Sequence, residues 1–180
     1  MKIEKIHHVA YRCRDAKETV QWYGKMLGMD FVLAIAENQV PSTKAPDPYM
    51  HVFLDAGMGN VLAFFELPNS PEMGRDPNTP GWVQHIAFKV NDRAALLEFK
   101  GHLEQNGVEV LGVTDHGAFH SIYFFDPNGH RLELACPDPQ ETALMKQLDA
   151  VKWDMLEEWS RTRRAPAHAA FLHQREFSAR

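Results

Sequence analysis

The residues best suited to chemistry lie in one short stretch, TDHGAFHSIYFFDPNGHRLE, at positions 114–133. Within eighteen residues it carries three histidines, a tyrosine and a glutamate, namely His116, His120, Tyr123, His130 and Glu133. Imidazoles and carboxylates are common ligands of divalent metals and common acids and bases in catalysis. Because a lone histidine is more often a surface or core residue, the surrounding pattern decides what this cluster means.

The same stretch is typical of a β-hairpin that would position these side chains. Residues 121–125 are β-branched or aromatic, residues 126–129 (DPNG) have turn chemistry, and residues 131–134 resume alternation. Successive side chains of a strand point to opposite faces, so Glu133 shares a face with Arg131. The sequence therefore predicts a carboxylate presented by a strand close to a turn.

Composition favours a single domain with neither nucleic acid nor membrane as partner. The chain has 180 residues, of which 44% are hydrophobic, enough for one buried core. A net charge of −5 gives no basic field, and no apolar run is long enough to span a membrane or resembles a secretory signal. Cys13 and Cys136 form no Cys-x-x-Cys motif. We expect a cytoplasmic protein with both thiols reduced and buried.

The first part of the chain reads as a βαβββ unit. Residues 2–13 alternate in polarity, which predicts a strand. A helix follows, with Asp15 as N-cap, Glu18 completing a capping box and Gly28 at the end. Three more strands are predicted, at residues 29–36, 49–54 and 61–67.

After a proline-rich linker at residues 68–81 the pattern starts again. The segment QHIAFKVND at residues 84–92 repeats HHVAYRCRD at residues 7–15 almost position by position. A helix and three strands follow, at residues 92–106, 108–113, 121–125 and 131–135. Such an internal repeat indicates two packed copies of one unit. We predict an α+β fold in which module 1 (residues 3–67) and module 2 (residues 82–137) form a half-barrel cup.

The repeat places candidate ligands at matching positions. His8 and His85 fall on the first strands of the two modules, and aligning FFEL with RLEL pairs Glu66 with Glu133. Modules related by a pseudo-twofold axis would bring these side chains together in the cup. Two imidazoles with one or two carboxylates suit Fe(II), Mn, Ni or Zn with open coordination positions.

Residues 3–135 resemble the vicinal oxygen chelate superfamily, which includes glyoxalase I, methylmalonyl-CoA epimerase, extradiol ring-cleavage dioxygenases and the fosfomycin and bleomycin resistance proteins. The motifs that carry the resemblance are HHVAYRCRD, FFEL, VQHIAFKVND and DPNGHRLEL. It implies a domain over residues 1–137 with the metal ligands His8, His85 and Glu133, and with Glu66 at the position of a fourth ligand in glyoxalase I.

Residues 114–133 also satisfy the extradiol dioxygenase pattern within this superfamily, from Thr-Asp-His through Ile-Tyr and Asp-Pro-Asn-Gly to Glu. By this resemblance His116 and Tyr123 would hydrogen-bond a bound catechol, with His120 a weaker candidate for proton transfer. It implies an enzyme that cleaves a small catechol-like aromatic with dioxygen. The expected cofactor is a divalent metal, Fe(II) ahead of Mn, Ni, Zn or Co, and the expected assembly is a homodimer.

The ligand count separates this function from its main alternative. Three protein ligands leave a six-coordinate ion three open positions, two for a catecholate and one for dioxygen. With Glu66 bound as well, two remain, which suffice for the enediolate of a glyoxalase- or epimerase-like lyase or isomerase acting on an α-hydroxycarbonyl compound. A ligand-sequestering protein like the bleomycin resistance proteins is a third possibility.

Module 1 departs from the dioxygenase pattern. Dioxygenases carry a further acid/base histidine where this chain has Gly59-Asn60, and His51 on the preceding strand either compensates or belongs to the core.

The remaining residues predict a helix at 138–164 followed by a tail at 165–180. Asp138 and Pro139 have the chemistry of a helix start, and a stripe at helical spacing follows, formed by Leu144, Leu148, Val151, Met155 and Trp159. We expect the stripe to pack on the modules or on a second subunit. Three arginines suit the end of the helix or an anionic substrate, Arg161, Arg163 and Arg164. The tail, with His168 and His173, is predicted to be solvated or to form a mobile flap.

Overall fold

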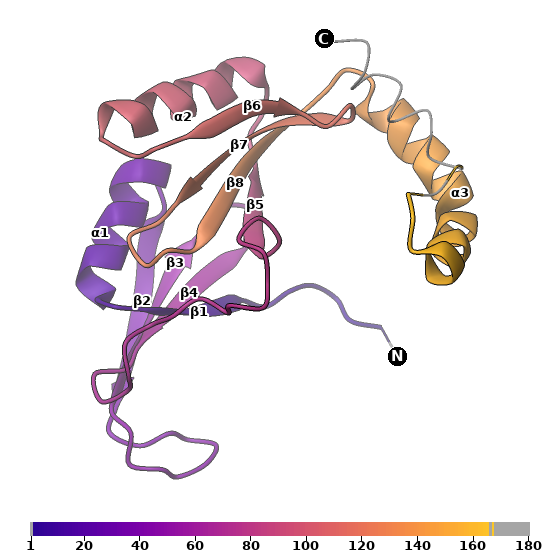
Figure 1. Cartoon of the computed structure of the whole chain (residues 1–180). Helices are drawn as coiled ribbons and strands as arrows, with labels where there is room; N and C mark the ends of the chain where they lie inside the picture. The colour runs from indigo at the N-terminus through magenta and orange to yellow at the C-terminus, as the bar shows by residue number, and fades with distance from the viewer. Residues whose placement is uncertain (1, 166, 168–180) are drawn as a thin grey trace.

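The computed structural model describes residues 2–165 and 167 and has the predicted α+β architecture (Figure 1). Module 1 comprises β1 (Val9–Cys13), α1 (Ala16–Leu27), β2 (Asp30–Glu37), β3 (Tyr49–Asp55) and β4 (Val61–Glu66). Module 2 comprises β5 (His85–Lys89), α2 (Arg93–Gln105), β6 (Leu111–Asp115), β7 (Phe119–Phe125) and β8 (Arg131–Pro137). Their sheets have the same topology, β1-β4-β3-β2 and β5-β8-β7-β6, as the internal repeat predicts.

The first strand is shorter than the polarity pattern predicts. β1 begins at Val9, and residues 2–8 precede it without regular structure. The reason is the pairing of β1, because its parallel neighbour β4 begins only at Val61, and Val9 already lies opposite Leu62. An alternating segment without a neighbouring strand has no hydrogen-bond partner for its backbone. The strand predicted at residues 108–113 is also displaced, since β6 spans Leu111–Asp115.

Both module helices begin at aspartate caps. The Asp15 carboxylate accepts a hydrogen bond from the backbone N–H of Glu18 at 2.8 Å, as predicted, and Asp92 does the same for Ala95 at 2.9 Å. Each cap satisfies a backbone donor that the helix itself leaves unpaired. Gly28 ends α1 in the left-handed conformation, with φ of 67°.

The core lies between the helices and one face of each sheet. Its most buried members come from alternate positions of the strands and from the facing helix sides, and include Leu54, Phe64, Leu96, Phe124 and Leu132. Because strand side chains alternate between faces, the second face of each sheet is left to carry polar groups. That second face holds the candidate site.

The DPNG turn fastens module 2 to module 1. The Asn128 side chain accepts a hydrogen bond from the backbone N–H of Arg14 at 2.9 Å and donates one to the Thr19 hydroxyl at 3.1 Å. The buried Tyr23 hydroxyl donates to the Asp126 carboxylate at 3.0 Å. The two modules of one chain are therefore joined along their helix-bearing sides.

Both cysteines are free and buried, as predicted. Burial raises the pKa of Cys13 from 9.0 to about 11. A thiol that ionises at higher pH when folded favours folding below its unfolded pKa, and this contribution is lost as pH rises through the folded value. Between pH 9 and 11 we expect Cys13 to cost the fold about 3 kcal/mol. Urea unfolding at several pH values, compared with the Cys13→Ala variant, measures this loss. An equal pH slope in the variant would contradict it.

Helix α3 (Glu141–Thr162) extends away from both sheets (Figure 1). Only Leu144 of α3 is buried, while Trp159 of the predicted stripe is exposed, as is Trp153. The predicted packing on the modules of the same chain is therefore limited to the start of the helix. Asp138 is not its N-cap, because its carboxylate accepts from the Gln140 N–H in a turn before the helix. His168, His173 and Pro166 lie outside the described residues.

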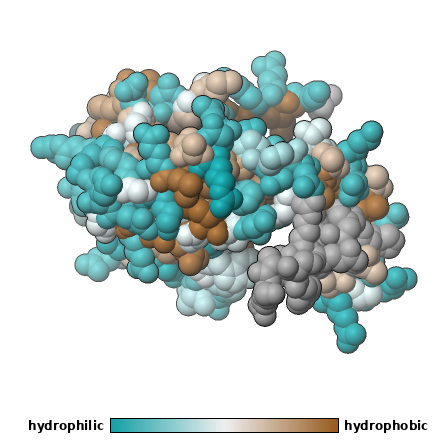
Figure 2. Space-filling view, turned by 90° about the horizontal axis from the view of Figure 1, so that it is seen from above, coloured by the Kyte–Doolittle hydropathy of each residue, from teal (hydrophilic) through white to brown (hydrophobic). Residues whose placement is uncertain are grey.

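The surface seen from above is largely hydrophilic, with scattered apolar patches (Figure 2). Within residues 2–165 and 167, no helix combines the length and apolar character that crossing a bilayer requires.

Candidate metal centre

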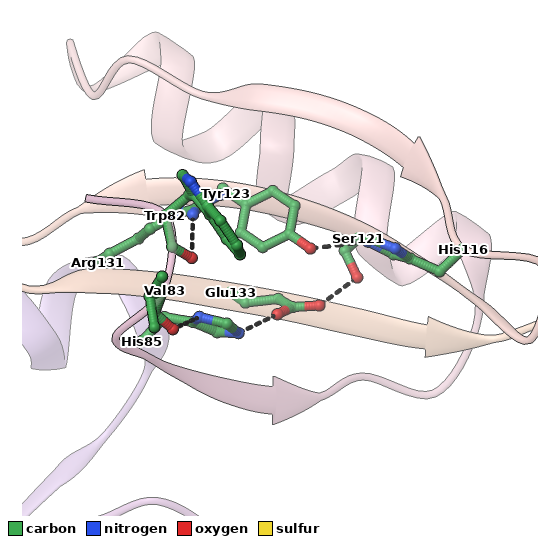
Figure 3. Close-up of polar contacts among 8 residues, drawn as sticks. All are labelled: Trp82, Val83, His85, His116, Ser121, Tyr123, Arg131 and Glu133. Atoms are coloured by element: carbon green, nitrogen blue, oxygen red, sulfur yellow. Dashed lines mark hydrogen bonds and ion pairs between the residues drawn. The ribbon is translucent and has the colours of Figure 1, made fainter. Parts of the chain in front are cut away.

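Two of the predicted ligands meet on the open face of the module 2 sheet (Figure 3). His85 starts β5 and Glu133 lies on the neighbouring β8, and the His85 Nε2 atom is 3.0 Å from the Glu133 Oε2 atom. The Glu133 residue is only 4% exposed. Its second oxygen accepts a short hydrogen bond from the Ser121 hydroxyl. A buried carboxylate thus faces an imidazole, with no lysine or arginine paired to it in the described residues.

The orientation of His85 leaves its Nε2 atom for a ligand. The Nδ1 atom lies 3.0 Å from the backbone carbonyl of Val83, which can only accept a hydrogen bond. Nδ1 therefore carries a hydrogen, and Nε2 is the ring atom directed toward Glu133, where a metal would bind. An N–H held by a carbonyl is the usual support of a metal-binding histidine.

Tyr123 and His116 form a second pair beside the first. Tyr123 lies directly opposite Glu133 in the β7–β8 register, and its hydroxyl is 2.7 Å from the Nε2 atom of His116. The rings of His85 and Tyr123 meet edge to face at 6.1 Å. Burial, followed by the negative charge of Glu133, raises the pKa of Tyr123 above its usual value. The phenol therefore keeps its proton at neutral pH and is available as a hydrogen-bond donor.

Ser121 and Arg131 were not singled out in the sequence, yet both shape this face. Ser121 holds Glu133, and the Arg131 guanidinium lies 4.2 Å from the centre of the Tyr123 ring while donating to the Trp82 carbonyl. The signal that could have found them is strand parity. Ser121 and Tyr123 are two residues apart on β7, and Arg131 and Glu133 are two apart on β8.

His8 lies on the other module and does not join this pair within one chain. It precedes β1 and contacts His7, His51 and Phe53. His51 is stacked on Phe65 at 3.6 Å, and its Nε2 atom is buried without a hydrogen-bond partner. Burial, followed by the charge of His8, lowers the pKa of His51, so its imidazole is neutral at pH 7. No group of three histidine, cysteine or acidic residues in metal-binding proximity occurs within the described chain.

The strand register changes the predicted equivalence of Glu66 and Glu133. Glu133 lies opposite Ala87 on β5, and the matching residue Ala10 on β1 lies opposite Ala63. Ala63 is therefore the residue of module 1 that corresponds to Glu133 of module 2. Glu66 lies three residues further along β4. An odd offset turns a strand side chain to the other face. The Glu66 Oε2 atom accepts a hydrogen bond from the backbone N–H of Ala16, at the start of α1, at 2.7 Å.

This contact predicts a structural effect for Glu66. Replacement by alanine removes an acceptor from the first turn of α1, where a negative charge is favourable, and is expected to cost about 1–2 kcal/mol of unfolding free energy. Metal affinity should stay within about twofold of the wild type. Urea unfolding and metal titration measure the two quantities, with Asp15→Ala as the matched control at the same helix end. A loss of metal affinity without a loss of stability would instead identify Glu66 as a ligand.

The two remaining histidines of the cluster point away from this face. His120 lies opposite Cys136 in the β7–β8 register, and its ring nitrogens are 3.8 and 3.9 Å from the carboxylates of Asp115 and Asp138. His130 contacts the Arg12 carbonyl at 2.7 Å and so links the modules. The structure thus brings His85, Glu133, Tyr123 and His116 together and leaves His120, His130, His8 and Glu66 elsewhere.

The donor set of this face fits a divalent metal in part. His85 Nε2 and Glu133 Oε2 converge as a nitrogen and an oxygen donor, and no lysine or arginine is paired with the buried carboxylate in the described residues. Imidazole and carboxylate together are ligands for Zn, Mn, Ni and Fe. Two ligands are fewer than such a site requires, so a third must come from outside this pair.

The fold and this face define a protein of two βαβββ modules, one of which presents a histidine and a glutamate to a common point. The chain belongs to the Glyoxalase/Bleomycin resistance protein/Dioxygenase superfamily, whose sequence profile matches residues 5–134. This match confirms the resemblance to the vicinal oxygen chelate proteins.

Three individual relatives share less than 30% sequence identity with this chain. The chain is 27% identical over 141 residues to the Bacillus subtilis protein named "Putative ring-cleaving dioxygenase MhqA". The aligned region covers 77% of this chain and 42% of that protein. The chain is similar to the glyoxalase family protein from Enterococcus faecalis, with a TM-score of 0.55 and 28% identity over 75% of this chain and 99% of that one. The fold also matches the Listeria monocytogenes fosfomycin resistance protein FosX, solved with Mn(II) and sulfate, at a TM-score of 0.58 and 18% identity over 79% and 99%.

Proposed function

We propose that this protein is a metal-dependent extradiol-type dioxygenase that cleaves a small catechol-like aromatic. The observation that carries the proposal is the linked set on one sheet face, in which His85 contacts Glu133 and Tyr123, and Tyr123 contacts His116. His116, Tyr123 and Glu133 belong to the dioxygenase motif, and His85 is a ligand implied by the superfamily resemblance. The relative named as a ring-cleaving dioxygenase supports the same assignment, although this chain spans less than half of its length.

The third metal ligand, in this proposal, is His8 supplied by a second copy of the chain. His8 would join His85 of the partner subunit and Glu133 of the partner subunit, because the modules of one chain are joined along their helix-bearing sides. Strand β2 offers an exposed surface that a second copy could cover. All eight residues of β2 are exposed, among them the apolar Phe31, Leu33 and Ile35. Apolar surface of this extent marks protein interfaces.

The chain's own residues would bind and orient the substrate. When bound, Fe(II) or Mn(II) would lower the pKa of a coordinated hydroxyl and bring dioxygen next to it. The protonated Tyr123 hydroxyl would donate a hydrogen bond to a substrate oxygen, and His116 Nε2 would hold or return that proton. Arg131 keeps the Tyr123 ring in place from its other face. The buried partner of Glu133, Ser121, fixes the carboxylate for the metal.

The lyase or isomerase alternative has less support from the geometry. It requires Glu66 as a fourth ligand or as a proton carrier, and the Glu66 carboxylate instead meets the N–H of Ala16 beside α1. Three protein ligands would leave a six-coordinate ion positions for both a chelating catechol and dioxygen.

Anaerobic reconstitution with Fe(II), followed by oxygen uptake across a catechol panel, tests the proposed function. We expect stoichiometric oxygen consumption and a coloured ring-opened product with at least one catechol. Turnover of an α-hydroxycarbonyl compound without oxygen uptake would replace the proposal with the isomerase.

A further inference from the structure

A cavity of about 340 Å³ adjoins the candidate metal centre at the start of β5. It lies under the linker, between the end of β1 and the DPNG turn, and His85 is part of its wall. Three arginines also line it, Arg14, Arg75 and Arg131. A molecule bound beside His85 can therefore extend a substituent into this cavity.

The three guanidinium groups are not neutralised by the protein. Each meets a backbone carbonyl, Arg14 that of Pro127, Arg75 that of Gly129 and Arg131 that of Trp82. None of them forms an ion pair with a carboxylate in the described part of the chain. Three unpaired positive charges in one cavity stand out in a chain whose net charge is −5.

The one acidic residue of the cavity wall is already engaged. The Asp76 carboxylate accepts a short hydrogen bond from the Thr79 hydroxyl and another from the Asn78 N–H at 2.9 Å. These bonds lower the pKa of Asp76 and hold its carboxylate in its own turn. The arginines thus keep their remaining N–H donors for an incoming anion.

Two of the arginines are held over aromatic rings. The Arg75 guanidinium carbon lies 4.6 Å from the centre of the Phe125 ring, and that of Arg131 lies 4.2 Å from the Tyr123 ring. Stacking leaves the edges of a guanidinium, with its paired N–H groups, free to grip a carboxylate in bidentate fashion. Phe125 also lines the cavity and adds apolar surface to its wall.

We propose that this cavity binds a carboxylate carried by the aromatic substrate, with Arg75 and Arg131 as its principal contacts. The proposal rests on the function assigned above, because it places the ring of the substrate at His85 and its acidic substituent under the linker. It identifies the substrate class as catechols that bear a carboxylate side group. Arg75 and Arg131 are then specificity-determining residues.

The test measures binding in protein stripped of metal, so that it does not depend on turnover. Isothermal titration calorimetry compares a catechol bearing a carboxylate with the matched catechol bearing a neutral carboxamide. We expect the carboxylate to bind about tenfold to a hundredfold more tightly, and this preference to shrink as salt is raised. Equal affinity of the two compounds would overturn the proposal.

Variants of the two arginines test which side chain produces the preference for the carboxylate. Arg75→Gln is expected to remove most of it, and Arg75→Lys to keep part of it, because lysine retains the charge but not the planar fork. Arg93→Gln, at an exposed position that begins α2, is the matched control and should bind like the wild type. A preference that survives both Arg75→Gln and Arg131→Gln would contradict the proposal. If the preference holds but no ring-opened product forms with Fe(II), the assigned reaction fails while the carboxylate site stands.

Discussion

Replacing Glu133 with glutamine is expected to weaken binding of Fe(II) or Mn(II) by more than about a hundredfold, because partners that merely support a ligand already contribute about 10–100-fold. The same substitution should stabilise the metal-free protein or leave its stability unchanged. Glu133 is 4% exposed and contacts His85 and Ser121, and no lysine or arginine is paired with it in the described residues, so the metal-free fold carries a buried charge without a permanent cation. A neutral amide removes that cost.

The effects on metal affinity and on metal-free stability together distinguish a metal ligand from a structural carboxylate. Metal at about one hundred times its dissociation constant should stabilise the wild type by about 3 kcal/mol and the Glu133→Gln variant by almost nothing. Thermal unfolding with and without metal measures both. Glu66→Gln, in which the carboxylate on the helix side of the sheet is altered, is the control. A Glu133→Gln variant that is destabilised without metal and still gains the full stabilisation from metal would make Glu133 a structural residue.

The second large effect concerns the pair formed by Tyr123 and His116. Removal of the hydroxyl in Tyr123→Phe or of the imidazole in His116→Gln is expected to lower kcat about 10²–10⁴-fold, the usual contribution of a positioned acid or base. Because the two side chains share one hydrogen bond of 2.7 Å, the double variant should lose little more than either single variant. Metal affinity should be unchanged in all three.

Steady-state kinetics with the best catechol of the panel measures these losses. His120→Gln is the control, since the His120 ring nitrogens approach Asp115 and Asp138 on the other face of β7. Full turnover in Tyr123→Phe would remove the role assigned to the phenol. Losses that multiply in the double variant would show that Tyr123 and His116 act separately.

Most of the fold could be predicted because the sequence repeats itself. The match between residues 7–15 and 84–92 gives two copies of one unit, and strand alternation and aspartate caps then place the elements. The extent of β1 could not be predicted from alternation, because a strand lasts only as long as its neighbour, and β4 begins at Val61. The exposure of most of α3 could not be predicted either, because it depends on which surfaces the two modules leave for the helix to pack on.

The candidate site was predictable only where local motifs determine it. Tyr123 and Glu133 lie on one hairpin, so turn chemistry and strand parity suffice to bring them onto one face, and His116 lies in the turn just before β7. Glu66 was misaligned with Glu133 because FFEL and RLEL look alike, whereas the register of β1 with β4 offsets them by three residues. Distances between modules depend on how whole sheets pack, and no local pattern encodes them.

The proposed metal centre is shared between two copies of the chain, and mixing two inactive variants tests this most directly. His8→Ala and Glu133→Ala are each expected to be inactive and unable to retain metal. After the two are unfolded, mixed and refolded together, half of the dimers are hybrids, and each hybrid regains one intact site made of His8 from one chain and Glu133 from the other. About a quarter of the wild-type metal content and activity should return. No recovery, although hybrid dimers form, would contradict a centre shared between subunits.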